Sequence, residues 1–370
     1  MCNGKNKRGS VDTALRVRLT PFFFLALGLA LLSAVIHFLC AKTPALADFF
    51  VSNVSPILRK TLGFVSAPFP LSLAETFVVT SPAWAALLAF FARRAARDAR
   101  RTSRMLSLLL SVPLLLYSLF VFSFAVGYYA TPLADRLSLE EEEPNAENLA
   151  ALALFLAEKA EEYAGIAGVR VEGEGSVMPF SYAEMNEKLI LAYDGVEEKY
   201  GILSNFAVGT KPVLLSRPMA YTHITGVYTF MTGEMNVCTA FPDFATLYTA
   251  AHEMAHARGI AREDEANFVA FLVCESSSDP YVRYSGYVNL LQYVLNALYD
   301  TDPKLYKTLW NQYSDTVIAE LKAYNQVVKQ YSGVASEIAG DINNAYLESM
   351  GTGGSVSYSL VVRLAVRYFE

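Results

Sequence analysis

Three long apolar segments near the start of the chain constrain its fold more than any other feature. The first, LTPFFFLALGLALLSAVIHFLCA, occupies residues 19–41 and contains no Asp, Glu, Lys or Arg. The second, residues 70–92, is interrupted only by Glu75, and the third, residues 106–129, lies in a charge-free stretch that continues to Ala134. A helix of about 20 apolar residues crosses the roughly 30 Å hydrocarbon core of a bilayer. We therefore expect a membrane region with three transmembrane helices within residues 19–134.

Composition supports a membrane region joined to a folded domain. Of 370 residues, 53% are hydrophobic and 18% are charged, which is too apolar for an ordinary soluble enzyme. The formal net charge is −6, and the sequence has neither a nucleotide-binding glycine loop nor a basic aromatic patch. We therefore expect the lipid bilayer as a partner, and no nucleic acid.

Positive charge predicts the orientation of the spans. The loop between the second and third spans carries six arginines, from Arg93 to Arg104. The N-terminal tail, residues 1–18, is also basic, with Lys5, Lys7, Arg8, Arg16 and Arg18. Lys and Arg are enriched on the cytoplasmic side of membrane proteins. With an odd number of spans, we expect a cytoplasmic-membrane protein whose N-terminus is cytoplasmic and whose residues after the third span are extracytoplasmic.

The first span has an alternative interpretation as a cleaved signal peptide. Ala45-Leu46-Ala47 resembles the small-residue motif at which such peptides are cut. The apolar run is longer than the roughly 7 to 15 residues usual in signal peptides, which favours a retained helix. The later domain lies outside the cytoplasm under both interpretations.

The cysteines leave two alternatives open. Cys2 and Cys40 lie in the tail and the first span, so Cys238 and Cys274 are the pair that an oxidising compartment could join. We expect two buried thiols, with a disulfide as the alternative.

The apolar periodicity of residues 145–370 predicts a mainly helical domain. Asn145 can cap the helix ENLAALALFLAEKAEEYAG, and SYAEMNEKLILAYDGVEEKYG repeats its three- and four-residue spacing. A further helix begins with Asp302 as its cap and Pro303 in its first turn, and its pattern continues to Gly333. KPVLLS and GVYTFMTGEMNVCTAF instead have the β-branched and aromatic residues of a hairpin or edge strand. The fold class expected is α+β, mainly helical, with a small sheet.

The stretch AAHEMAHARGIAREDEANFVAFL holds the strongest functional signal. His252 and His256 are four residues apart, so on a helix both imidazoles face one side and can reach one zinc ion. Glu253 follows the first histidine and can act as general base, as in the HExxH motif of zinc peptidases. Unpaired imidazoles would be costly to bury in this apolar run, which argues against an ordinary solvated helix face.

A third ligand is expected a few residues further on. Gly259 can end the first helix, and a second helix starting near Arg262 would return Glu263 toward the metal. Asn267 lies on the same face as Glu263 and could orient a ligand histidine. Glu265 is the alternative ligand, but on a helix it points about 200° away from Glu263. We prefer Glu263.

These residues resemble known families. HExxH followed by E-x-E-A-N looks like the gluzincin metallopeptidases, which implies that Glu263 is the third zinc ligand and that Asn267 supports a histidine. The separation of His256 and Glu263 by six residues is shorter than in better-studied gluzincins. PFPLSLAE, MPFSYAEMNEK, LLSRPMAYTHITGVYTFMTGEMNV, HEMAHARGIAREDEANFVAFLVC and DPYVRYSGY together resemble the bacterial membrane-protein family "domain of unknown function 3810" (DUF3810). The resemblance implies a membrane-anchored zinc metallopeptidase.

The chemistry expected is hydrolysis of peptide bonds with one Zn²⁺ as cofactor and Glu253 as general base. The substrate would be a peptide or protein at the cell surface or in the envelope. Substrate could pair with the edge of the GVYTFMTGEMNVC strand. Possible donors to the developing oxyanion are Tyr281, Arg283, Tyr284 and His223.

A different class of function stays open, a membrane-bound sensor or scaffold with a structural zinc site, or a pseudoenzyme. Such a site would be closed by a fourth protein ligand, for which Asp264 and His223 are the candidates. Glu253 would have no role there, so we favour the hydrolase.

Overall fold

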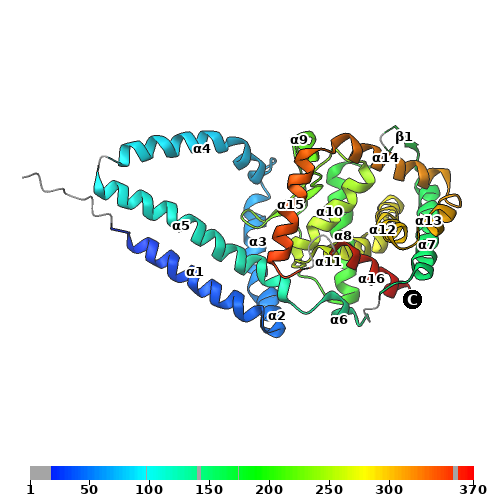
Figure 1. Cartoon of the computed structure of the whole chain (residues 1–370), viewed down its shortest axis with the longest axis horizontal. Coiled ribbons are helices and arrows are strands. Elements are labelled where there is room, and N and C mark those ends of the chain that lie inside the picture. Colours follow the sequence, from blue (N-terminus) through cyan, green and yellow to red (C-terminus); the bar gives the residue numbers. More distant parts are fainter. Residues whose placement is uncertain (1–17, 97, 140–142, 174, 353–356) are drawn as a thin grey trace, which may run out of the picture. The chain divides into compact units, whose positions relative to one another are not determined.

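The computed structural model describes residues 18–96, 98–139, 143–173, 175–352 and 357–370. The chain divides into two compact units. The smaller unit contains Val78–Ser118 and the described residues up to Val35, and the larger unit contains Ile36–Phe77 and Leu119–Glu370. Three long helices, α1 (Pro21–Cys40), α4 (Leu73–Ala95) and α5 (Ala99–Ser123), run through both units (Figure 1).

These three helices confirm the expected apolar spans. Each is long and apolar enough to cross a membrane by length and composition. The predicted and observed bounds differ most for the third span. The sequence predicted a helix over residues 106–129, whereas α5 runs from Ala99 to Ser123. The residues that follow form a 3-10 helix, η1 (Ala125–Tyr129), whose residues from Ala125 to Tyr128 are buried in the larger unit. The sequence stays apolar past the span because η1 is buried in protein.

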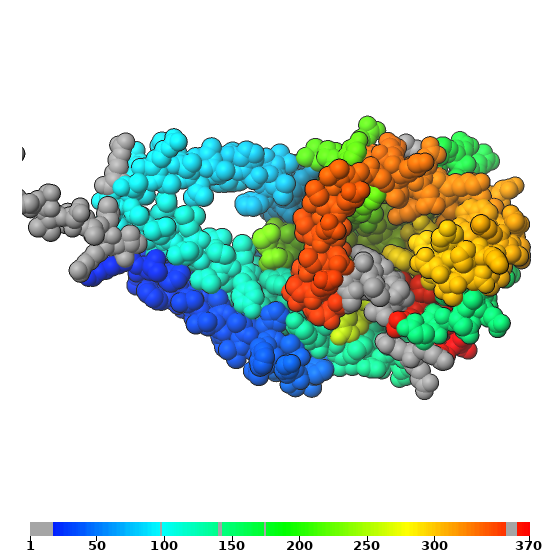
Figure 2. Space-filling model, in the orientation of Figure 1, coloured from blue at the N-terminus to red at the C-terminus, as the bar shows by residue number. Residues whose placement is uncertain are grey.

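The larger unit is mainly helical, as predicted. Its remaining helices are α2 (Pro44–Asn53), α3 (Ser55–Ser66), α6 (Leu133–Leu137), α7 (Ala146–Ala167), α8 (Tyr182–Tyr200), α9 (Ser216–Ala220), α10 (Asp243–Arg258), α11 (Glu263–Ser276), α12 (Pro280–Thr301), α13 (Pro303–Trp310), α14 (Asp315–Tyr331), α15 (Val334–Ser349) and α16 (Ser357–Phe369). Asn145 and Ser181 cap α7 and α8, each in a capping box. Asp302 caps α13 as expected, with Pro303 in the first turn. Figure 2 shows α15 as a ridge on the visible face of this unit.

The helix predicted to run from Asp302 to Gly333 is two helices. It breaks between Trp310 and Asp315, where Ser314 begins α14 by accepting a hydrogen bond from the backbone N–H of Val317. A serine that can cap a helix competes with helix continuation, and the apolar periodicity alone did not reveal this.

The strands form two small sheets. β1 (Val171–Glu172) pairs with β2 (Gly175–Ser176) in an antiparallel hairpin. The second sheet has the order β3-β5-β4, where β3 (Lys211–Pro212) is parallel to β5 (Glu234–Val237) and β4 (Gly226–Thr229) is antiparallel to it. The hairpin β4–β5 confirms the predicted hairpin, and β4 is an edge strand.

The core of the larger unit lies where α10, α11 and α12 pack on one another and α7 packs on α12. Phe244, Phe268 and Phe271 are fully buried there. Cys238 and Cys274 are free buried thiols, which is the first of the two alternatives for this pair. This apolar packing surrounds α10, the helix that carries both histidines of the motif.

Candidate metal centre

Two helices and a tight turn bring His252, His256 and Glu263 together. The histidines lie one turn apart on α10, and their Nε2 atoms are 3.0 Å from each other. Glu263 is the first residue of α11, and its Oε2 lies 3.1 Å from His252 Nε2. Its Oε1 lies 3.6 Å from His256 Nε2. One ligand atom from each side chain therefore lies within 4.8 Å of the other two.

Gly259 makes this turn possible. It ends α10 with a φ of 111°, a conformation that side-chain-bearing residues rarely adopt. A Cβ at this position would also lie 2.8 Å from a guanidinium nitrogen of Arg59, which is buried beside it. The chain then needs only three residues after Gly259 to start α11. Six residues between His256 and Glu263 are therefore enough to place the carboxylate beside both imidazoles.

The spacing of these atoms fits a tetrahedral zinc ion. Ligand atoms at 2.0–2.2 Å from zinc lie roughly 3.3 Å from one another in tetrahedral geometry. The distance between the two Nε2 atoms, 3.0 Å, and the distance from His252 Nε2 to Glu263 Oε2, 3.1 Å, are close to this value, and the other Glu263 oxygen, Oε1, lies 3.6 Å from His256 Nε2. His256 Nδ1 donates to the carbonyl oxygen of Ile260 at 2.7 Å, which leaves its Nε2 lone pair free for a cation.

Strong electrostatic coupling joins the three side chains. Burial alone would raise the pKa of Glu263, but His256 and His252 hold that pKa far below its usual range. Burial lowers the pKa of His256, yet the Glu263 carboxylate outweighs burial and raises this pKa to about 9. Without a metal the Glu263 carboxylate is therefore paired with a protonated His256, and a bound divalent cation would take the place of the proton on His256 Nε2.

Glu253 lies beside the cluster, against the sheet. The side chain is buried, and its Oε2 has no hydrogen-bond partner among the described residues. Burial raises the pKa of Glu253, while the neighbouring histidines lower it. A Cβ at Gly226 in β4 would lie 2.5 Å from Glu253 Oε1, so glycine is required for this approach. Glu253 is therefore a carboxylate with one free oxygen in an apolar, enclosed position.

The free edge of β4 faces Glu253. In an antiparallel pair, alternate residues direct their N–H and C=O groups away from the partner strand. Tyr228 opposes Met235 in β5, and its backbone lies near the Glu253 carboxyl group. The unpaired edge of the sheet thus lies next to the candidate base.

Two of the predicted neighbours have other partners. Glu265 Oε1 accepts hydrogen bonds from Leu133 N at 2.8 Å and Arg262 Nη1 at 3.0 Å, and it fixes the start of α6. It is therefore not part of the cluster. Asn267 Oδ1 accepts from Tyr293 Oη at 3.1 Å, and within the described chain neither Asn267 nor the free Nδ1 of His252 has a bond to the other.

The residues predicted as oxyanion donors lie in other networks. Tyr284 donates to the buried Glu320 at 2.7 Å, and the Tyr281 hydroxyl lies 3.0 Å from Ser176 Oγ. Arg283 donates to Ser277 O and Tyr163 Oη. His223 Nε2 lies 3.5 Å from Ser332 Oγ. Tyr281, Arg283 and Tyr284 lie near the start of α12 and contact β2, α7 and α14, and His223 lies beside the residue that follows α14. The described cluster also includes neither Asp264 nor His223 as a fourth ligand.

Three aromatic residues near the cluster were not predicted. The Phe124 ring packs edge-on against His256, with centroids 5.6 Å apart. The hydroxyls of Tyr128 and Tyr346 are 3.2 Å apart. Burial and the nearby charge of Glu263 raise the pKa of Tyr346. Tyr128 and Tyr346 are 218 residues apart in sequence, and no local pattern connects them.

Cavities lie at both ends of this region. One of about 880 Å³ lies at the N-terminal end of α10, against Asp243 and Tyr331, and contains none of the cluster residues. Another, of about 440 Å³, is lined by Asp264 and Glu265, which directly follow Glu263. The second cavity therefore adjoins the first turn of α11 and is large enough to hold water.

Comparison with known proteins gives a family but no activity. A family model described as "Protein of unknown function (DUF3810)" matches residues 50–366. No curated protein and no solved structure matches the chain.

Proposed function

The chain belongs to the DUF3810 family, and we propose that its larger unit is a zinc-dependent peptidase held at a membrane by three transmembrane helices. The observation that carries this proposal is the convergence of His252, His256 and Glu263, whose ligand atoms lie within 4.8 Å of one another, with the buried Glu253 beside them. The order of these residues resembles that of gluzincin metallopeptidases. A closed structural site is less favoured, because the described cluster offers three ligands and leaves a position for water.

In the proposed reaction the metal ligands and Glu253 have separate roles. Zinc held by three protein ligands supplies an acidified water and a Lewis acid. Glu253 Oε2, which has no other partner among the described residues, accepts the proton of the attacking water. The oxygen of that water adds to the peptide carbonyl carbon, and the C–N bond then breaks as Glu253 passes the proton to the leaving nitrogen.

The substrate backbone would be held by the free edge of β4. An extended peptide adds to such an edge through main-chain hydrogen bonds, which gives affinity without sequence specificity. Because this edge lies against Glu253, a peptide paired with β4 has its backbone beside the base. Tyr346, which lies near Glu263 and touches Tyr128, takes the place of the earlier candidates as donor to the carbonyl oxygen.

The decisive test compares the wild type with Glu253→Gln and Glu161→Gln. Glu161 is an exposed glutamate on α7, so its variant makes the same chemical change away from the cluster. Zinc per chain is measured by mass spectrometry, and cleavage is measured on a peptide library. We expect equal zinc in all three proteins and at least about 100-fold slower cleavage by Glu253→Gln only. A zinc-loaded wild type that cleaves nothing would instead support the sensor or scaffold.

The orientation of the larger unit is part of the proposal. The basic tail and the arginine-rich loop favour a cytoplasmic N-terminus in a bacterial cytoplasmic membrane, with the metal centre outside. Alkaline phosphatase fused after Glu370 should be active in intact cells, since this enzyme folds outside the cytoplasm. Activity of a β-galactosidase fusion at the same position would reverse the orientation.

A further inference from the structure

The metal-ligand cluster adjoins the end of a candidate membrane span, and we propose that it cuts membrane-anchored polypeptides within a few residues of the bilayer surface. This inference rests on the proposed peptidase function and adds its substrate class. It depends on where the chain leaves the membrane, not on which side the larger unit lies.

The length of α5 places its end at the lipid boundary. From Met105 to Ser123 the helix has 19 residues without charge. At 1.5 Å per residue this is about 28 Å, close to the roughly 30 Å of bilayer hydrocarbon. Arg104, which precedes this run, would lie at the opposite headgroups. The helix therefore has no surplus length, and Phe124 emerges at the surface of the hydrocarbon.

Phe124 and the last turn of α5 contact the site directly. The Phe124 ring lies 5.6 Å from the His256 ring and 5.5 Å from that of Tyr228, measured between centroids. Phe120 lies 5.1 Å from Phe230, the residue that follows β4. One end of β4 thus lies at the end of the span, while its other end, Gly226, lies at Glu253.

The direction of β4 sets the distance between the cut and the membrane. From Gly226 to Phe230 an extended chain advances four residues, or about 13 Å. A substrate paired with the free edge of β4 would run from the base toward the lipid boundary. Because Tyr228, two residues along β4, contacts Phe124 at that boundary, the bond cut would lie about two to four residues from the point where the substrate enters the bilayer.

The segment between the first two spans presents an apolar surface to the lipid. Within the larger unit, α3 has one buried face that includes Arg59, Gly63 and Ser66. Its opposite face and its neighbours carry exposed apolar side chains, namely Phe49, Ile57, Phe64, Val65, Phe69 and Leu71. No acidic residue occurs between Asp48 and Glu75. Because the chain continues from both ends of this segment into candidate spans, the bilayer is the occupant of this surface.

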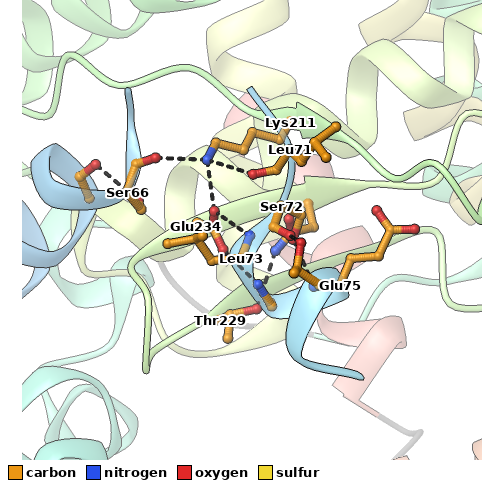
Figure 3. A network of polar contacts seen from close by, with 12 residues as sticks. Ser66, Leu71, Ser72, Leu73, Glu75, Lys211, Thr229 and Glu234 are labelled. Carbon is orange, nitrogen blue, oxygen red and sulfur yellow. Dashed lines mark hydrogen bonds and ion pairs between the residues drawn. The ribbon is translucent and has the colours of Figure 1, made fainter. Parts of the chain in front are cut away.

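A buried ion pair ties the sheet to the second span (Figure 3). Glu234 in β5 accepts hydrogen bonds from Leu73 N at 2.9 Å and Ala74 N at 3.0 Å, in the first turn of α4. Lys211 Nζ lies 2.7 Å from Glu234 Oε1 and donates to Ser66 O at 2.8 Å. β5 is paired with β4 along its length. These contacts therefore hold β4, the strand that would bind substrate, at a set distance from the start of α4.

The geometric premise can be tested without activity. Single cysteines replace Met231, at the tip of the β4–β5 hairpin, and Asn311, beyond α13, in a Cys2→Ser background, and each carries a fluorescent label. Val112→Cys, on the exposed side of α5, marks the membrane interior. In vesicles of brominated phosphatidylcholine we expect quenching at positions 112 and 231, and none at 311. Quenching at 112 without quenching at 231 would overturn the placement of the site at the surface.

The substrate class is tested with the full-length protein in vesicles. One peptide library is coupled to a lipid through a linker of four residues or through one of thirty, so that both share the same surface concentration. We expect bonds near the short-linker anchor to be cut at least 10-fold faster than the same bonds on the long linker. Equal rates would overturn this inference and leave the peptidase intact. No cleavage of either format by zinc-loaded protein would overturn the proposed function itself.

Discussion

At the scale of the residue, the metal centre depends on side chains whose positions local sequence controls. His252, Glu253 and His256 are fixed by one helical turn, so their arrangement could be predicted from spacing alone. Glu263 could be predicted once Gly259 was recognised as a helix end. Tyr346 could not, because its place near Glu263 results from the packing of α15 and not from any nearby motif.

The choice between Glu263 and Glu265 predicts opposite results for two similar variants. Glu263→Gln should lose zinc at neutral pH and keep its fold, since within the described residues the polar contacts of its carboxylate are with the two histidines. Glu265→Gln should keep zinc but lose roughly 1–3 kcal/mol of stability, because Leu133 N and Arg262 lose a charged acceptor. Zinc content and thermal denaturation of the purified proteins measure both effects. Full zinc content in Glu263→Gln would rule out this ligand.

Gly226 offers a second test at this scale. In Gly226→Ala the new methyl group would lie 2.5 Å from Glu253 Oε1 and must displace the carboxylate. We expect unchanged zinc content with cleavage about 100-fold slower, as when a general base is lost. Gly165→Ala is the matched control, since a Cβ there meets nothing within 4 Å. Similar activity of the two variants would show that Glu253 does not act where the structure places it.

At the scale of the element, the turn between α10 and α11 decides whether the ligands meet. Helix periodicity predicted both helices, but the closeness of Arg59 to Gly259 comes from α3 and could not be predicted from this stretch. The hairpin β4–β5 was predictable from its residues, whereas its free edge against Glu253 depends on the tertiary fold. Local sequence patterns thus predicted the helices and strands, but not the tertiary contacts between them.

Two glycine variants compare this turn with a helix end far from the metal centre. Gly259→Ala and Gly201→Ala each place alanine at a helix end with positive φ, 111° and 61°, and each should cost about 1 kcal/mol or more. Only at Gly259 does the Cβ meet a neighbour, Arg59, at 2.8 Å. We therefore expect zinc affinity to fall 10-fold or more in Gly259→Ala and to stay unchanged in Gly201→Ala. Titration with a competing chelator measures the affinities.

The tie between the sheet and α4 predicts a pH dependence of stability. Burial raises the pKa of Glu234, but hydrogen bonds from Lys211, Leu73 and Ala74 outweigh burial and hold this pKa below its ordinary value. A depressed carboxyl pKa stabilises the folded state above the unfolded pKa of about 4.3, and this contribution is lost as pH falls through the folded value. Glu234→Gln should therefore melt several degrees lower than the wild type at pH 7. The difference should shrink below about pH 4.

Thermal denaturation in detergent from pH 8 to pH 3 measures this difference. Glu161→Gln, which alters an exposed glutamate, should melt like the wild type throughout. A gap between Glu234→Gln and the wild type that persists unchanged into acid would show that the Glu234 carboxylate is not the source of the stability.

At the scale of the whole molecule, the ends of all three candidate spans belong to the unit that carries the metal centre. Ile36–Phe77 includes the end of α1 and the start of α4, and Leu119–Glu370 includes the end of α5. Hydropathy predicted the spans, but it could not predict that the third ends at the histidines. That position follows from the burial of η1, where a Cβ on Gly127 would lie 2.9 Å from the Cβ of Ala261.

The effect of zinc removal on the fold of the whole molecule distinguishes a catalytic zinc site from a structural one. The core of α7, α10, α11 and α12 is apolar and continuous, and Phe244, Phe268 and Phe271 are buried in it without any contribution from the cluster. We therefore expect chelation by phenanthroline to leave the helical circular dichroism intact and to lower the melting temperature only modestly. Zinc should restore that temperature in a concentration-dependent manner, because a ligand of the native state stabilises by RT ln(1 + [Zn]/Kd). Glu253→Gln should respond to zinc like the wild type, and Glu263→Gln should not respond. Unfolding of the larger unit on chelation would mean that zinc holds the fold together, which is the behaviour of a structural site and of a scaffold.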